Sequence, residues 1–266
     1  MQESAARDDD SSNTSNRRGL LRGIATGTGA VGVAGLAGCV GSSNSSSVTT
    51  SVSRRVDADS TLLSKQEFDE YVAEMHDRYG DSGPWGTRGT EPDHELSYVG
   101  AWTVSTESQT TPPDTLPLDD LVAVYRIPEE ESRGTLDYYQ FWVWTAVEPS
   151  DGATVRRLRP KVKMIGDERQ MRMYSPAAEV TNGPVSVGLS QPTVEGLNAT
   201  VPLTSGTIRV DPEETRVGEA GAYTPVWSGE TTSVQSVTAT FEASWPSSSH
   251  RKFDWSVELR GETDSS

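Results

Sequence analysis

The chain has very few of the residues that cross-link small exported domains through disulfides or metal ions. It contains a single cysteine, Cys39, among 266 residues, so no disulfide can form within the chain. Its three histidines include no pair at the helical spacing of a zinc-binding motif. A domain of about 200 residues buries enough apolar surface to fold without such cross-links. We therefore expect a fold that depends on its hydrophobic core, and no cofactor or metal.

Positive charge is also scarce. The chain has 23 basic residues against 39 acidic ones and a net charge of −16, and only four of the basic residues are lysines. A strongly negative field disfavours non-specific contact with nucleic acid, so we expect no nucleic-acid partner. An acidic composition poor in lysine is typical of haloarchaeal proteins. The alternative is an acidic secreted protein from a GC-rich organism.

Long, strongly apolar runs are absent as well. The most apolar stretch near the N-terminus, residues 23–40, is interrupted by six glycines and is too weak to span a membrane. Arg17 and Arg18 precede this stretch, followed by an apolar pair and Arg22. Adjacent arginines before a mildly apolar run resemble the twin-arginine export signal, which delivers proteins that have already folded.

The apolar stretch closes with Leu36-Ala37-Gly38-Cys39, which resembles the lipobox of bacterial and archaeal lipoproteins. The signal and the composition together resemble haloarchaeal lipoproteins exported by the twin-arginine route. The resemblance implies cleavage before Cys39, a lipid on its sulfur, and a protein anchored on the extracellular side of the cell membrane. An uncleaved N-terminal anchor and cleavage at another position are the alternatives.

Three regions follow from this reading: a signal peptide at 1–38, a flexible tether at 39–60 and a single β-rich extracytoplasmic domain at 61–266. The tether is inferred from residues 42–53, of which nine are serine or threonine and none is charged. Asn44 and Asn198 each begin an N-glycosylation sequon.

Periodicity predicts one helix and a series of strands. Residues 64–79 begin with a capping-box pattern and place five apolar side chains on one helical face. After them the pattern alternates with a period of two. The expected strands cover residues 96–107, 121–127, 137–147, 154–165, 170–174, 185–190, 200–203, 207–210, 223–227, 234–245 and 252–260. The chain is therefore expected to form a mainly β, antiparallel β-sandwich-like domain with one N-terminal amphipathic helix.

The aromatic strand at 137–147 is expected to be covered on both faces. Tyr138, Trp142 and Trp144 fall on one face, and Tyr139, Phe141 and Val143 on the other. An opposing sheet would cover one face and the helix the other. A sugar-stacking platform is the alternative reading.

Two short motifs suggest chemistry. Gly80-Asp81-Ser82-Gly83 resembles the nucleophile stretch of trypsin-like proteases, but Pro84-Trp85 disrupts the motif, and we interpret the string as a helix end followed by a turn. His94 lies between carboxylates that could hold a cation, although an acidic turn explains the pattern. We expect no catalytic residue and no metal site.

One strand is unusually basic. Within 154–165, alternate positions on one face carry Arg157, Arg159, Lys161 and Lys163, opposite Leu158, Val162 and Met164. A cationic ribbon on an anionic protein could dock an acidic protein or glycan. The alternative is that these side chains neutralise neighbouring acidic strands, or guard an exposed sheet edge against pairing.

These observations favour a membrane-anchored, non-catalytic binding or interaction module at the cell envelope. Its expected partners are the membrane, through the lipid anchor, and an acidic protein or glycan. The alternatives are an extracellular hydrolase with a carboxylate site that the sequence does not reveal, and a structural envelope component.

Overall fold

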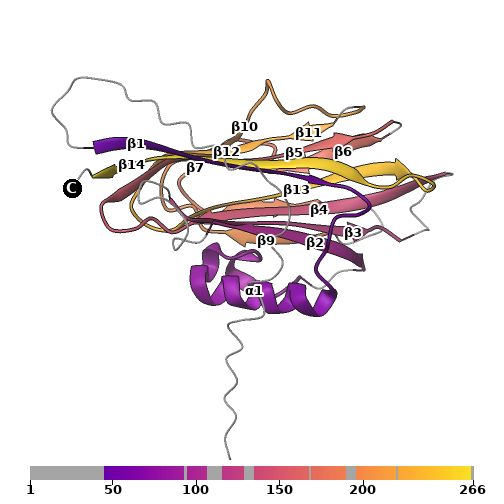
Figure 1. The fold of residues 1–266 in the computed structure, drawn as a ribbon, viewed down its shortest axis with the longest axis horizontal. Helices are drawn as coiled ribbons and strands as arrows, with labels where there is room; N and C mark the ends of the chain where they lie inside the picture. The colour runs from indigo at the N-terminus through magenta and orange to yellow at the C-terminus, as the bar shows by residue number, and fades with distance from the viewer. Residues whose placement is uncertain are drawn as a thin grey trace, which may run out of the picture.

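The computed structural model describes residues 45–92, 95–106, 116–128, 135–167, 169–189, 196–219 and 221–264. Two antiparallel sheets pack face to face, and a helix with a short hairpin covers the outer side of one of them (Figure 1). This architecture confirms the expected class, a mainly β, sandwich-like domain with one N-terminal amphipathic helix.

The first sheet, called sheet A, has the strand order β1-β14-β5-β12-β10-β7, with β11 beside β5. Its strands are β1 (Ser45–Val56), β5 (Ala153–Ile165), β7 (Val180–Thr181), β10 (Thr207–Val210), β11 (Ala222–Tyr223), β12 (Pro225–Thr231) and β14 (Lys252–Asp264). The second, sheet B, has the order β2-β3-β4-β13-β6. Its strands are β2 (Ser97–Ser105), β3 (Leu118–Arg126), β4 (Leu136–Val147), β6 (Gln170–Ser175) and β13 (Gln235–Pro246).

The helix forms where the sequence predicts it. Helix α1 (Lys65–Tyr79) begins at a complete capping box, in which the Ser64 hydroxyl accepts the Glu67 N–H and the Glu67 carboxylate accepts the Ser64 N–H. Its buried side chains lie on one face: Phe68, Tyr71, Val72, Met75 and Tyr79. The helix ends at Gly80, whose φ of 56° other residues rarely adopt.

The core between the sheets is rich in aromatic side chains. Phe141 of β4 stacks on Phe241 of β13 at a centroid distance of 4.5 Å and meets Phe253 of β14 edge-on at 5.5 Å. On the other face of β4, Trp142 packs against Trp85 at 4.6 Å. Strand β4 is thus covered on both faces, as predicted, which places its aromatic side chains in the core rather than on a sugar-binding surface.

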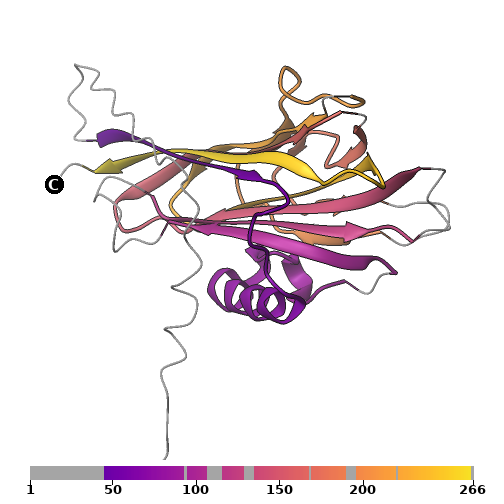
Figure 2. The same ribbon diagram turned by 45° about the vertical axis from the view of Figure 1, so that its right-hand side comes forward.

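A third layer covers the outer face of sheet B. It consists of α1, the short helices at Gly80–Ser82 and Gly86–Arg88, and a hairpin of β8 (Val185–Gly188) and β9 (Asn198–Val201). Gln140 of β4 joins the sheet to this layer by accepting the Leu197 N–H at 3.0 Å. Figure 2 shows α1 against one side of the sandwich only. The two sheets therefore differ, because only sheet B is covered on both sides.

The expectation of a flexible tether at 39–60 is wrong for residues 45–56. They form β1, which pairs with β14 along twelve consecutive residues, from Ser45 opposite Asp264 to Val56 opposite Phe253. Val48, Thr50 and Val52 point inward and are buried, whereas Ser51 and Ser53 are exposed. The Ser/Thr-rich composition made the segment look like a linker. Its inward positions, however, carry β-branched residues that alternate with exposed serines, which is typical of a half-buried strand.

Smaller differences concern the strand ends. The strand expected at 223–227 is interrupted at Thr224, which separates β11 from β12. Its N–H donates to the Thr215 hydroxyl and its carbonyl accepts the Asp211 N–H, so its backbone bonds to a loop instead of β5. The two-residue strand β7 was not expected. The remaining expected strands are present, with ends that differ by up to four residues.

Candidate partner-binding surface

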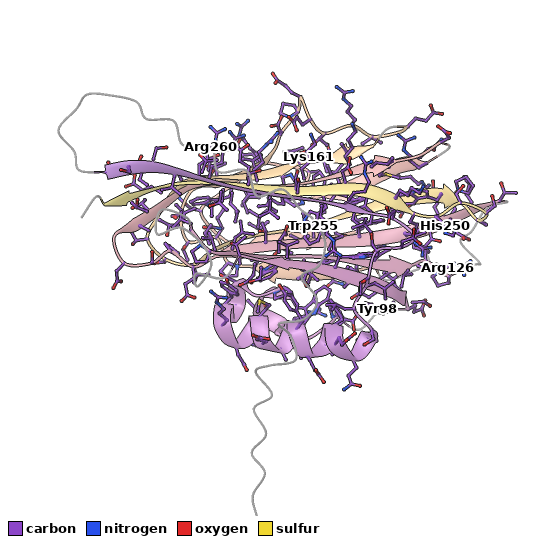
Figure 3. The ribbon with its side chains drawn as sticks, in the orientation of Figure 1. Tyr98, Arg126, Lys161, His250, Trp255 and Arg260 are labelled. Atoms are coloured by element: carbon purple, nitrogen blue, oxygen red, sulfur yellow. The ribbon has the colours of Figure 1, made fainter. Side chains whose placement is uncertain are left out.

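The basic ribbon predicted from sequence lies on β5, in the middle of sheet A. Leu158, Val162 and Met164 are buried against sheet B, so the four alternate cations share the outer face, as predicted. Figure 3 shows Lys161 and Arg260 on the side of the sandwich away from α1. The outer face that carries the ribbon also includes alternate residues of β14 and β1, and it is the face of sheet A that solvent reaches.

The centre of the ribbon is neutralised from within the chain. Arg159 donates to Asp211 at 3.2 Å and forms an ion pair with Glu214 at 2.7 Å, and Lys161 reaches the same Glu214 at 2.5 Å. Asp211 and Glu214 come from the loop between β10 and β11. Hydrogen bonds from Lys161, the larger contribution, and from Arg159 hold the pKa of the Glu214 carboxyl below its usual range. These two cations therefore stabilise a loop.

The ends of the ribbon are different. Neither Arg157 nor Lys163 forms an ion pair with any described residue. Arg157 lies opposite another cation, Arg260 of β14. Lys163 lies opposite Asp254, which already binds Arg55 at 2.8 Å. Arg157 and Lys163 are thus the ribbon residues whose charge the described chain leaves available.

Arg156 marks a bulge next to this surface. Arg157 is opposite Arg260 and Val155 is opposite Gly261, which leaves Arg156 as the extra residue. Its guanidinium binds Glu262 of β14 at 3.1 Å and also Glu230 of β12. The bulge therefore turns a fifth cation of β5 toward two neighbouring strands, so that it is compensated on both sides.

Ser82 lies in a turn that the core holds in place. Gly83 N–H closes the turn on the Gly80 carbonyl at 2.9 Å, and the indole N–H of Trp144 donates to the Ser82 carbonyl at 2.9 Å. Trp142 donates in the same way to the Pro84 carbonyl at 2.8 Å. The stretch that resembles a protease motif is a helix end followed by a turn, as we interpreted it, and it docks on two tryptophans of sheet B.

Several predicted site residues lie outside the described part of the chain: Cys39, Arg17, Arg18, Asn44 and His94. Asn198 is described and is half-buried on β9, where its side-chain amide donates to the Gly196 carbonyl at 3.1 Å. Among the described residues, no three His, Cys, Asp or Glu side chains are grouped in a way that could hold a metal ion.

Sequence reasoning missed three buried carboxyl groups among the described residues: Asp119, Asp120 and Glu242. Glu242 of β13 is fully buried and accepts a hydrogen bond from Arg172 at 2.8 Å. Asp119 of β3 is 2% exposed and accepts hydrogen bonds from the Tyr79 hydroxyl at 2.6 Å and from Arg78 at 2.7 Å. Asp120 is 1% exposed on the opposite face, between the sheets. Burial raises the pKa of the Asp120 carboxyl well above its usual value, although the nearby Trp255 indole opposes the shift. The available signal was an acidic pair at the start of an otherwise apolar strand.

Within the described ranges, no helix is long and apolar enough to cross a membrane. Comparison with known proteins gives this chain no assignment: no protein-family model matches it, and no curated protein matches its sequence.

Proposed function

We propose that the chain is a lipid-anchored extracytoplasmic protein whose sandwich serves as a non-catalytic interaction module at the cell envelope. The lipobox at Cys39 and the position of β1 support this proposal. Strand β1 begins at Ser45, six residues after Cys39. Six residues of extended chain span at most about 20 Å, so a lipid on Cys39 would hold the sandwich close to the membrane surface.

The proposed interaction surface is supported by a difference between the two sheets. Sheet B is buried on both faces, whereas the outer face of sheet A presents alternate polar side chains to solvent. On that face Arg157 and Lys163 keep charges that no described carboxylate neutralises. Such cations on a protein of net charge −16 favour an acidic partner, either a protein or a glycan.

The anchor is tested by Cys39→Ser in the native host, with Ser42→Ala as the control. The serine variant has no sulfur for the thioether, so we expect it in the medium or soluble fraction, whereas the control stays with the membrane. Retention of the Cys39→Ser protein in washed membranes would contradict lipid anchoring at Cys39.

The docking face is tested by two double variants with the same change in charge. Arg157→Ser with Lys163→Ser removes the available cations, and Arg159→Ser with Lys161→Ser removes those that bind Asp211 and Glu214. In pull-downs from solubilised membranes, the first variant should lose the partners that the unsubstituted chain recovers, and the second should keep them. Equal recovery by both variants would contradict a cationic docking site at Arg157 and Lys163.

A further inference from the structure

The four sheet edges of the sandwich are not protected equally. Sheet A ends at one side in β7, which has only two residues. Sheet B ends in β2 and β6, and each is bridged by a residue outside the strand: Leu63 pairs with Ala101 of β2, and Gly218 pairs with Met171 of β6. Strand β1 forms the fourth edge, which is twelve residues long, and Figure 1 shows it beside β14 at the border of sheet A.

Strand β1 has few of the features that protect an exposed edge. Natural edges are blunted by bulges, prolines, charges or covering segments. The pairing of β1 with β14 has no register shift, and residues 45–53 contain no proline, glycine or charge. Charge appears only at the end of the strand, where the inward Arg54 donates to the Thr103 carbonyl of β2. No described residue pairs with the outer edge from Ser47 to Ser53, so within the described part of the chain this stretch is open to a further strand.

Thr50 in the middle of this edge has an unsatisfied side chain. It points inward and is 3% exposed, yet its hydroxyl makes no hydrogen bond to any described residue. A buried hydroxyl without a partner is destabilising, and such groups are uncommon in folded proteins. Because this oxygen is covered within the single chain, a neighbouring strand would satisfy it only after the Thr50 side chain turned toward the edge.

We propose that β1 pairs antiparallel with β1 of a second copy of this chain, around a two-fold axis at Thr50. In this register Val48 lies opposite Val52, Thr49 opposite Ser51 and Ser47 opposite Ser53, and each pair occurs twice by symmetry. The two Thr50 side chains face each other with Cβ atoms about 4.5–5.5 Å apart, which allows their hydroxyls to hydrogen-bond once both turn toward the edge. Sheet A then continues across both copies.

Charge favours a second copy as the occupant of this edge. Two molecules of net charge −16 repel each other over most of their surfaces, but residues 45–53 bring no charge to the contact. The arginines that follow do not meet, because Arg54 and Arg55 face Ser46 and Ser45 of the other copy. The inward valines also extend the apolar row of the core in register, so the strand is complementary to itself in both shape and charge.

The proposed pair is compatible with anchoring of both copies on one membrane. Ser45 of one copy lies opposite Arg55 of the other, so the two Ser45 residues are about 33 Å apart along the strands. Each is joined to Cys39 by six residues, which reach up to about 20 Å. Both lipids can therefore enter one membrane surface that lies parallel to β1. The inference does not depend on the docking face around Arg157.

The decisive experiment places charge on the edge of the full chain. Ser47→Lys with Ser53→Lys introduces two exposed lysines, each opposite a lysine of the other copy, and Ser186→Lys with Ser233→Lys adds the same charge at exposed positions elsewhere. Sedimentation equilibrium is measured at the lowest salt that keeps the chain folded, because salt screens exposed charges. We expect dimers for the unsubstituted chain and the control, and a dissociation constant raised at least about tenfold for the edge variant.

Complementary charge should restore the dimer. A chain with Ser47→Glu and Ser53→Glu is also expected to be monomeric alone, but mixed with the lysine variant it should form a heterodimer, since each lysine then faces a glutamate. A monomeric unsubstituted chain at every concentration would overturn the proposal. So would a dimer that the edge lysines leave unchanged, because the contact would then lie on another surface.

Thr50→Val tests the position of the two-fold axis. Valine keeps the shape of threonine and removes the unsatisfied hydroxyl. We expect the dimer dissociation constant to rise about three- to tenfold, while the midpoint of denaturation of the monomeric edge variant does not fall. If Thr50→Val leaves dimerisation unchanged, the axis does not pass through Thr50.

Discussion

The hydroxyl of Tyr79, the last residue of α1, donates a 2.6 Å hydrogen bond to the Asp119 carboxylate near the start of β3. The same carboxylate oxygen accepts a bond from Arg78 at 2.7 Å. Because Asp119 is nearly fully buried, these bonds satisfy a charge that burial would otherwise make costly. The end of the helix is thus fixed to sheet B by a polar contact in addition to its apolar face.

Tyr79→Phe should lower the free energy of unfolding by about 1–3 kcal/mol, because it removes a donor to a buried charge. Tyr71→Phe on the same helix is the matched control. The Tyr71 hydroxyl is buried and makes no hydrogen bond with any described residue, so its removal should be neutral or stabilising. Denaturant unfolding measures both variants, and equal losses would contradict a specific role for the Tyr79–Asp119 bond.

Asp120→Asn should change how stability depends on pH. Burial raises the pKa of Asp120 in the folded protein, so the folded state binds this proton more tightly than the unfolded state does. The resulting contribution to stability is fully present below about pH 4, the pKa of an unfolded aspartate, and is lost as the pH rises toward the folded pKa. Asparagine does not titrate.

The unfolding free energy of Asp120→Asn relative to the unsubstituted chain should therefore increase as the pH rises above about 4. Unfolding curves at a series of pH values measure this difference. The amide can also change the unfolding free energy by an amount that does not depend on pH. That amount does not affect the test, since the test uses only the pH dependence of the difference. Parallel pH profiles would show that Asp120 ionises as easily in the folded state as in the unfolded one.

Trp144→Phe should destabilise the protein by about 2–4 kcal/mol, because it removes the bond to the Ser82 carbonyl and leaves space in the core. Ser82→Ala keeps that carbonyl and should change stability by less than about 0.5 kcal/mol. Thermal unfolding of both variants tests the structural role of the turn. A larger loss for Ser82→Ala than for Trp144→Phe would mean that the serine hydroxyl, and not the backbone, is the important group.

Glu214→Gln should loosen the loop that binds Arg159 and Lys161. The group is partly exposed, so the loss of stability at neutral pH is expected to be about 0.5 kcal/mol or less and to shrink at high salt. Since the pKa of Glu214 is lowered, its contribution is present above the usual glutamate pKa and disappears as the pH falls. Glu213→Gln, an exposed neighbour, is the control, and limited proteolysis of the loop is the measurement.

Local patterns were sufficient for much of the fold. The capping box at Ser64 and the five-residue apolar face define α1 because both signals depend on residues within one or two turns. The alternation in β5 predicted which cations share a face, since side chains in a strand alternate whatever the strand pairs with. The two-sided burial of β4 followed from aromatic residues on both of its faces.

Features that depend on distant residues could not be predicted. Whether Arg159 and Lys161 are available depends on Asp211 and Glu214, which lie about 50 residues away in the chain. Strand β1 was read as a tether because serine and threonine suit both flexible linkers and exposed strand positions. Only its pairing with β14, some 200 residues later, decides between the two.

The position of β1 also determines how the molecule would bear mechanical load. The strand leaves sheet A at Ser45, at the end where it pairs with Asp264. If Cys39 carries the proposed lipid, a pull on it along the strand axis would load all twelve residue pairs between β1 and β14 in shear, instead of opening them one after another. Strand pairing resists force along the strand axis most strongly, so in the proposed arrangement, with the membrane parallel to β1, the load it would resist best is drag along the membrane surface.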